Sequence, residues 1–285
     1  MGKSYRIGYL GPRGTFSEQA ARLFLEGRDG ESTACDSLEQ VLDRVVSGEL
    51  DEGIVPVENS TEGAVGVTLD LLALHYTLAV RGELVLPVSH CLMAKAGVEL
   101  AQVERVLSHP QALAQCRGFL QQQLSRALPV ECPSTVAAAE QVAGQSRPWA
   151  ALAPAAAAVE YGLAVLVPEA NDYPGSATRF WAVGREPLSS PGAGAKTSIV
   201  FSIKDRPGAL YHILGEFARR GLNLTRIESR PAKKRLGDYL FFIDFIGSTH
   251  IPQVQEALAG VGFRTLFLKV LGSYPCLTPD LTEAP

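Results

Sequence analysis

The chain has few cysteines and no long apolar run, and each shortage excludes a class of protein. Only five of its 285 residues are cysteine, an odd number without a C-x-x-C pair. This pattern suits free thiols in a reducing compartment better than a disulfide framework. No uncharged apolar stretch reaches the roughly 20 residues that cross a bilayer, and Arg6 and Arg13 interrupt the apolar run that a signal peptide needs. We therefore expect a cytoplasmic protein without a membrane partner.

Basic residues are also fewer than acidic ones. The 26 lysines and arginines, against 30 aspartates and glutamates, give a net charge of −4. Since no Lys/Arg-rich run offsets this balance, the sequence argues against a nucleic-acid partner. An anionic ligand would have to be held by local groups, because the overall field does not attract it.

What the sequence does contain, from about residue 5 to 183, is an alternation of apolar runs and segments of helical periodicity. The runs at residues 5–10, 54–57 and 103–107 predict strands. The alternation predicts an α/β fold with mostly parallel sheets. Polar residues follow each of these three runs, and open α/β sheets bind ligands at the carboxyl ends of their strands. We therefore expect distant segments to share one site.

The third polar cluster lies where the predicted strand 103–107 meets a predicted helix at 109–126. Ser108 and Gln111 have the spacing of a capping box, and Pro110 falls in the first turn, where its missing N–H costs little. The unpaired N–H groups and partial positive charge of a helix N-terminus suit a carboxylate. A plain, well-capped helix explains the same residues, so both interpretations stay open.

A small, turn-prone segment at residues 189–195 predicts a linker to a second domain at 196–275. Beyond it, the pattern predicts six elements in βαββαβ order, at residues 197–203, 207–220, 223–229, 239–246, 252–259 and 263–271. Such a sheet leaves strand edges that commonly pair between subunits, so we expect a homodimer or homotetramer. The tail 276–285 is short and polar, and we expect it to be loose.

Six short segments carry the most specific information. Four precede residue 181: GPRGTFS at 11–17, VPVENS at 55–60 followed by Gly63, SHPQALAQC at 108–116, and TRF at 178–180. Two follow it: GAL at 208–210 and ESRP at 228–231. In this order the first four resemble motifs of the prephenate dehydratase family, and the last two resemble the phenylalanine-binding motifs of its attached ACT domain. Each match is weak alone, but together they are highly specific.

The resemblance implies a two-lobed catalytic domain over residues 1–188, similar to periplasmic binding proteins, followed by a ferredoxin-like ACT domain. By analogy, lobe one comprises about residues 1–76 and 168–188, and lobe two about 77–167. The implied reaction converts prephenate to phenylpyruvate with loss of water and carbon dioxide, and phenylalanine regulates it. Formation of a benzene ring drives this reaction, so the enzyme has to hold two carboxylates and assist a departing hydroxide. No metal or redox cofactor is needed, and the chain looks monofunctional.

The resemblance also implies roles for single residues. We expect Thr178 to hydrogen-bond the departing hydroxyl, although threonine is also a good strand residue. Arg179 either binds a substrate carboxylate or holds its own segment through an internal ion pair. His109 is the candidate general acid, with a structural role as the alternative. Glu58 would repel a dianion, so we expect it to orient Arg13 or Arg179. The expected substrate contacts are Thr15, Asn59, Ser60, Ser108, Gln111 and Phe180, the last of which is also a candidate for core packing.

In the second domain the resemblance implies a phenylalanine site between paired ACT domains. Its expected residues are Gly208, Ala209, Leu210, Asn223, Glu228, Ser229 and Arg230. A helix cap and an edge strand would account for the same residues without a ligand. One departure from the family is Ser176, where members often carry Asn, and this puts one substrate contact in doubt.

Of three rival interpretations, two remain at this point. An arogenate dehydratase would act on the amino analogue of prephenate, and a two-lobed binding module would turn nothing over. A dehydrogenase is excluded, because the glycines at 8, 11 and 14 lack G-x-G-x-x-G spacing and Pro12 offers no N–H to a phosphate.

Overall fold

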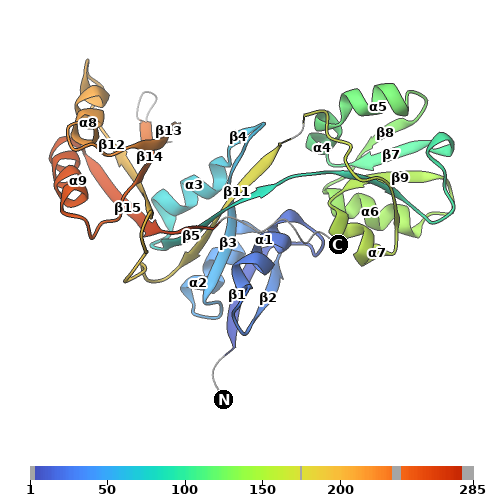
Figure 1. Ribbon diagram of the computed structural model, residues 1–285, viewed down its shortest axis with the longest axis horizontal. Coiled ribbons are helices and arrows are strands. Elements are labelled where there is room, and N and C mark those ends of the chain that lie inside the picture. The colour runs from blue at the N-terminus through green and yellow to red at the C-terminus, as the bar shows by residue number, and fades with distance from the viewer. Residues whose placement is uncertain (1–3, 174, 233–238, 278–285) are drawn as a thin grey trace.

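The structure is a computed structural model that describes residues 4–173, 175–232 and 239–277. It has three parts in a row: lobe one lies in the middle, lobe two on one side, and the C-terminal domain on the other (Figure 1). No helix in the described part of the chain is long and apolar enough to cross a membrane.

Lobe one is a mixed sheet in the order β16-β5-β11-β3-β1-β2, with β4 paired to β3. Its strands are β1 (Tyr5–Leu10), β2 (Gly30–Cys35), β3 (Glu52–Asn59), β4 (Gly63–Ala64), β5 (Ala79–Pro87), β11 (Ala177–Gly184) and β16 (Cys276–Leu277). Its helices are α1 (Phe16–Leu25), α2 (Leu38–Val46), α3 (Gly66–Asp70) and the π-helical turn η1 (Leu71–His75). β1 runs parallel to β2 and β3, whereas β11 runs antiparallel to β3 and β5.

Both faces of the lobe-one sheet are buried, as the side chains of β11 illustrate. Its alternate side chains point to opposite faces. Phe180 packs in the core beneath α1, whereas Trp181 and Val183 pack in a second core with α2 and residues of the C-terminal domain. Neighbouring residues of β11 therefore face different parts of the molecule.

Lobe two has a five-stranded sheet in the order β10-β6-β9-β7-β8. Its strands are β6 (Cys91–Ala94), β7 (Arg105–Ser108), β8 (Leu128–Glu131), β9 (Trp149–Ala153) and β10 (Ala164–Val167). Its helices are η2 (Leu100–Gln102, 3₁₀), α4 (Pro110–Gln115), α5 (Arg117–Gln123), α6 (Thr135–Gly144) and α7 (Ala155–Tyr161). The single helix predicted at 109–126 is wrong, because the backbone leaves helical geometry at Cys116, where φ is −113° and ψ is 16°.

The passage between the lobes lies further along the chain than expected. β5 pairs with β11 in the lobe-one sheet, so the chain crosses between Pro87 and Cys91 and not near residue 76. It returns between Val167 and Ala177, close to the expected position. The first crossing was misplaced because it came from analogy, and the pairing of β5 with β11, which keeps residues 79–87 in lobe one, is a long-range contact.

The C-terminal domain has the predicted βαββαβ order and the antiparallel strand order β13-β14-β12-β15. Its elements are β12 (Lys196–Ser202), α8 (Ala209–Ala218), β13 (Leu224–Pro231), β14 (Tyr239–Ile246), α9 (Pro252–Arg264) and β15 (Phe267–Tyr274). This is a ferredoxin-like fold.

The C-terminal domain is not a loosely tethered module. Phe242 and Tyr274, both fully buried, share one core with Val80 and Trp181 of lobe one. Just after Tyr274 the chain forms β16, which pairs in parallel with β5, so the expectation of a loose tail is wrong for Cys276 and Leu277. The remainder of the predicted tail, 278–285, lies outside the described residues.

Candidate active site

A pocket of about 270 Å³ opens between the two lobes. This volume is just below the usual range for ligand pockets, so it suits a small molecule. Its lining comes from both lobes and from the segment that joins them: Phe16, Asn59, Val88, His90, His109, Gln111, Ala112, Gln115, Pro133, Ser134, Thr135 and Thr178. Four of the residues predicted from the sequence meet here, namely Asn59, His109, Gln111 and Thr178.

Strand pairing brings Asn59 and Thr178 together from positions 119 residues apart. They are direct partners across the β3–β11 ladder, so their side chains lie on the same face of the sheet. The Asn59 side-chain amide donates a hydrogen bond of 3.0 Å to Thr178 Oγ1. Thr178 is 9% exposed, so its hydroxyl lies in a largely desolvated place beside the cavity.

His109 and Gln111 enter the pocket from the start of α4. His109 is the N-cap of this helix, and its Nδ1 accepts a hydrogen bond of 3.3 Å from the Gln111 N–H. With Nδ1 used as an acceptor, the neutral imidazole carries its proton on Nε2. His109 can therefore offer a donor to the cavity.

Ser108 and Phe180, both expected to contact substrate, are buried away from the pocket. Ser108 is the last residue of β7 and fully buried, and its hydroxyl donates to the Leu152 carbonyl at 2.6 Å. It is not the helix cap, because the strand runs one residue further than predicted. Phe180 is 1% exposed and packs in the core beneath α1. The expected substrate contact of either residue is therefore wrong.

Thr15 and Ser60 also do not line the pocket, and both hold local structure. Thr15 caps α1 by accepting from the Glu18 N–H at 3.3 Å and donates to the Pro12 carbonyl at 3.0 Å. Ser60 Oγ accepts from the Ala177 N–H at 2.9 Å, which fixes the loop after β3 against the start of β11.

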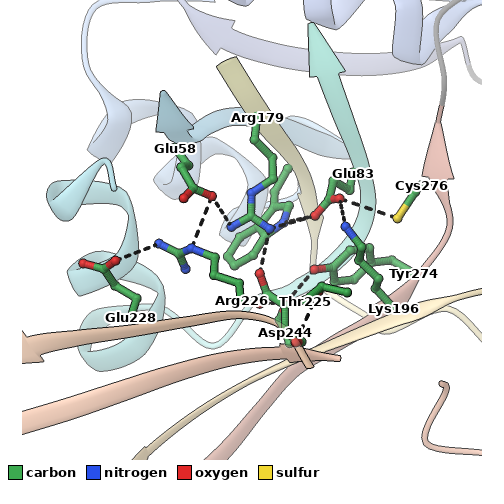
Figure 2. A network of polar contacts seen from close by, with 12 residues as sticks. Glu58, Glu83, Arg179, Lys196, Thr225, Arg226, Glu228, Asp244, Tyr274 and Cys276 are labelled. Atoms are coloured by element: carbon green, nitrogen blue, oxygen red, sulfur yellow. Dashed lines mark hydrogen bonds and ion pairs between the residues drawn. The ribbon is translucent and has the colours of Figure 1, made fainter. Parts of the chain in front are cut away.

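The Arg179 side chain does not line the pocket, and it points toward Asp244 of the C-terminal domain, as Figure 2 shows. Its guanidinium lies 2.6 Å from Asp244 of β14, 3.0 Å from Glu83 of β5 and 3.1 Å from Glu58 of β3. Of the two roles considered for Arg179, the geometry matches the internal ion pair. It does not match contact with a ligand in the pocket. The expected link between Glu58 and Arg179 is present.

Charges of both signs alternate within this interdomain cluster. Lys196 contacts Glu83 at 2.5 Å, and Arg226 contacts Glu58 at 3.2 Å and Glu228 at 3.7 Å, so three cations face four anions. Burial alone would raise the pKa of Glu83, but the charges of Arg179 and Lys196 outweigh it and lower that pKa. Burial likewise opposes the charged form of Arg179, and the Asp244 and Glu83 carboxylates overcome it and raise its pKa. Glu83 and Arg179 therefore both stay ionised near neutral pH.

Sequence reasoning missed His90 and Gln115, which also line the pocket. His90 is 4% exposed, and its Nε2 lies 3.2 Å from Gln115 Oε1. Burial lowers the pKa of His90 from 6.5 to about 4, so this imidazole is neutral at physiological pH. Gln115 lies four residues after Gln111, on the same face of α4, and that spacing could have revealed it. His90 lies in no helical or strand pattern that could have done so.

Ser176 replaces the Asn that is common in the family, and it does not line the pocket. It is 6% exposed, and its hydroxyl has no hydrogen-bond partner among the described residues.

A second pocket, of about 340 Å³, lies at the N-terminal end of α8 in the C-terminal domain. Gly208, Ala209 and Leu210 line it, as expected, and Gly208 adopts a left-handed φ of 78° that favours glycine. Tyr239 and Phe241 supply aromatic walls.

The other four residues expected at the phenylalanine site, Asn223, Glu228, Ser229 and Arg230, do not line this pocket among the described residues. Glu228 lies 3.7 Å from Arg226, and Arg230 lies 3.0 Å from Asp70 of lobe one. In a single chain, β13 therefore serves the domain interface.

The fold and the pocket define a class: a two-lobed α/β protein with a small-ligand cleft, fused to a ferredoxin-like domain that carries its own pocket. Comparison with known proteins gives the family. The prephenate dehydratase model matches residues 7–188, and the ACT domain model matches residues 197–263. The chain belongs to the prephenate dehydratase family and carries a C-terminal ACT domain.

Individual relatives agree with this assignment over nearly the whole chain. A prephenate dehydratase of Methanocaldococcus jannaschii is 40% identical over 273 residues, covering 94% of this chain and 97% of the relative. The crystal structure of prephenate dehydratase in complex with L-Phe from Arthrobacter aurescens has a TM-score of 0.86 at 39% identity, covering 95% and 90% of the two chains.

A third relative shows that this fold is found with another activity. The structure of GqqA, described as a novel type of quorum quenching acylase, has a TM-score of 0.85 at 32% identity, and the match covers 95% of this chain and 98% of that one. The reaction must therefore be argued from the pocket residues as well as from the fold.

Proposed function

We propose that this chain converts prephenate to phenylpyruvate, water and carbon dioxide, and that L-phenylalanine bound at the ACT domain lowers this activity. The observation that carries the proposal is the largely buried Thr178 hydroxyl, held by Asn59 at the edge of the cavity between the lobes. Membership of the prephenate dehydratase family gives the reaction to which this geometry is suited.

The chemistry requires little beyond placement and hydrogen bonding. The ring carboxylate leaves as carbon dioxide, its bonding electron pair completes the aromatic ring, and the ring hydroxyl leaves as water after gaining a proton. A donor that strengthens its hydrogen bond as negative charge develops on this oxygen lowers the barrier. Thr178 and His109 Nε2–H are the proposed hydrogen-bond donors, and solvent supplies the proton, because a neutral imidazole that lost its Nε2 proton would become an imidazolate.

The remaining lining residues suit the other parts of such a substrate. Gln111 and Gln115 carry amide donors, and Ser134 and Thr135 carry hydroxyls, all suited to carboxylate oxygens. Phe16, Val88 and Pro133 present apolar surface to a ring. Arg179 is not among the proposed substrate ligands.

Regulation by phenylalanine is supported by the contacts between the domains. Asp244 and Arg226 of the ACT domain contact Arg179 and Glu58 (Figure 2). Arg179 and Glu58 are the chain neighbours of Thr178 and Asn59. A change in the ACT strands that moved these partners would therefore act directly on the backbone of the two proposed site residues.

We further propose that the chain forms a homodimer or homotetramer through its ACT domains. β13 is an edge strand of the ACT sheet, and a second copy could satisfy its free edge. Pairing there would bring the expected residues of β13 into an intersubunit effector site.

One assay distinguishes the proposed function from its rivals. Purified protein is given prephenate, arogenate or an N-acyl amide, and phenylpyruvate, phenylalanine and free acid are measured, with and without added L-phenylalanine. We expect the highest kcat/KM for prephenate, and lower rates with phenylalanine present. A preference for arogenate would make the chain an arogenate dehydratase, and no turnover of any substrate would leave a binding module.

A further inference from the structure

Four side-chain hydrogen bonds run in series across the cleft, from lobe two to the proposed catalytic threonine. They join His90 Nε2 to Gln115 Oε1 at 3.2 Å, Gln115 Nε2 to Thr61 Oγ1 at 2.9 Å, Thr61 Oγ1 to Asn59 Oδ1 at 2.6 Å, and Asn59 Nδ2 to Thr178 Oγ1 at 3.0 Å. His90 and Gln115 belong to lobe two and its connection, and the other three residues belong to lobe one. The series therefore bridges the two walls of the pocket.

Thr61 sets the direction of the bond to Thr178 with two donors on one side of Asn59, its backbone N–H and its hydroxyl. The N–H of Thr61 donates to Asn59 Oδ1 at 2.9 Å, and a backbone N–H can only donate. The oxygen of the Asn59 amide must therefore face Thr61, and its NH₂ group must face Thr178. Thr178 Oγ1 is consequently an acceptor in this bond, and its own proton is not used there.

The same reasoning fixes the other half of the series. Asn59 Oδ1 has no proton, so the Thr61 hydroxyl must donate to it. Gln115 then has to present its NH₂ group to Thr61 Oγ1, which leaves Gln115 Oε1 to accept from His90. His90 must carry its proton on Nε2. Its burial, which lowers its pKa to about 4, agrees with a neutral ring of this tautomer.

We infer that this series sets the polarity of Thr178, with Thr61, Gln115 and His90 as positioning residues that direct the Thr178 proton toward the bound substrate. Among the described residues, none accepts a hydrogen bond from the Thr178 hydroxyl, and Thr178 lines the pocket. The hydroxyl is thus held as a donor for the leaving oxygen before substrate arrives. The inference rests on the proposed function, because it concerns the same hydroxyl.

Thr61 offers the cleanest test, because it is exposed and does not line the pocket. Thr61→Val removes the hydroxyl with little change in shape, and Thr61→Ser, the matched control, keeps it. We expect Thr61→Val to lower kcat about two- to tenfold, the rate equivalent of one net hydrogen bond, with KM nearly unchanged. Thr61→Ser should stay within about twofold of wild type.

A double-mutant cycle separates positioning from general damage. If Thr61 acts through the Thr178 hydroxyl, Thr61→Val should have no further effect in a Thr178→Val background. An equal loss in both backgrounds, an equal loss in Thr61→Ser, or unchanged kcat in Thr61→Val would overturn the inference. The wild-type assay keeps the two proposals apart: phenylpyruvate released by wild type supports the proposed function whatever the Thr61 variants do.

Discussion

The interdomain ion pair between Asp244 and Arg179 gives a sharp prediction for stability and regulation. Asp244 is 1% exposed and accepts hydrogen bonds from Arg179 Nη1 at 2.6 Å and from the Ser198 hydroxyl at 2.5 Å. Asp244→Asn keeps the shape but removes the charge. With the asparagine oxygen toward Arg179, its NH₂ group would face the Ser198 hydroxyl, which can turn and accept, so the loss falls on the contact with Arg179.

The size of the effect follows from what Arg179 retains. Removing one partner of an isolated buried ion pair costs about 3–5 kcal/mol. In this variant Arg179 still has Glu83 at 3.0 Å and Glu58 at 3.1 Å, so its buried charge remains paired. We therefore expect Asp244→Asn to lower the free energy of unfolding by about 2–3 kcal/mol, the value of one hydrogen bond to a charged group.

Tryptophan fluorescence can measure this loss during urea unfolding. The chain has two tryptophans, and Trp181 lies against Arg179, with the guanidinium 5.4 Å from the ring. A Trp149→Phe background leaves Trp181 as the single reporter. Glu256→Gln is the matched control, because it neutralises a carboxylate whose ion pair with Arg220, at 3.5 Å, is exposed: the Glu256 side chain is 69% exposed. This control should stay within about 0.5 kcal/mol.

The same variant tests whether the ion pair carries regulation. We expect Asp244→Asn to bind phenylalanine, measured by calorimetry, yet to be inhibited several-fold less at saturation, because typical coupling is about 5- to 150-fold. A stability loss below about 0.5 kcal/mol would refute the reasoning about the buried pair. Undiminished inhibition would refute this route for the coupling.

Two further predictions concern a buried imidazole and a tight domain contact. Burial lowers the pKa of His90 from 6.5 to about 4, so between these values the unfolded chain binds more protons. Stability should then fall by about 2 kcal/mol from pH 7 to pH 5, and His90→Phe should remove that part of the slope; parallel pH profiles of the two proteins would contradict this. At Gly272 an added Cβ would lie 2.2 Å from the Val80 carbonyl oxygen, so Gly272→Ala should cost about 3 kcal/mol in urea unfolding. Gly144→Ala, with nothing within 4 Å of the added Cβ, should be nearly neutral, and similar values for the two alanine variants would argue against the close contact.

The parts of the fold that depend on local pattern could be predicted from the sequence. The βαββαβ order of the second domain follows from apolar periodicity alone, and the structure confirms it. The convergence of Asn59, His109 and Thr178 also followed from sequence, because polar residues at strand ends share one edge of an α/β sheet.

Other features depend on contacts that sequence does not encode locally. Successive side chains of a strand point to opposite faces, so Arg179 must point away from the pocket once Thr178 is known to face it. Its partner Asp244, however, lies 65 residues away in another domain. Ser108 was taken for a helix cap because its spacing to Gln111 fits, and only the pairing of Ser108 with Glu131 shows that it still belongs to a strand. His90 could not be found, because a single histidine between two strands has no periodicity.

In the proposed reaction the Thr178 hydroxyl, in the pocket between the lobes, promotes the loss of water from prephenate. The decisive measurement is phenylpyruvate release by Thr178→Val, compared with wild type and with Thr178→Ser. We expect Thr178→Val to lose about 100-fold or more in kcat, the value of a donor to a developing oxyanion, while phenylalanine still binds and the serine variant keeps much of its activity. Turnover by Thr178→Val near the wild-type rate would contradict it.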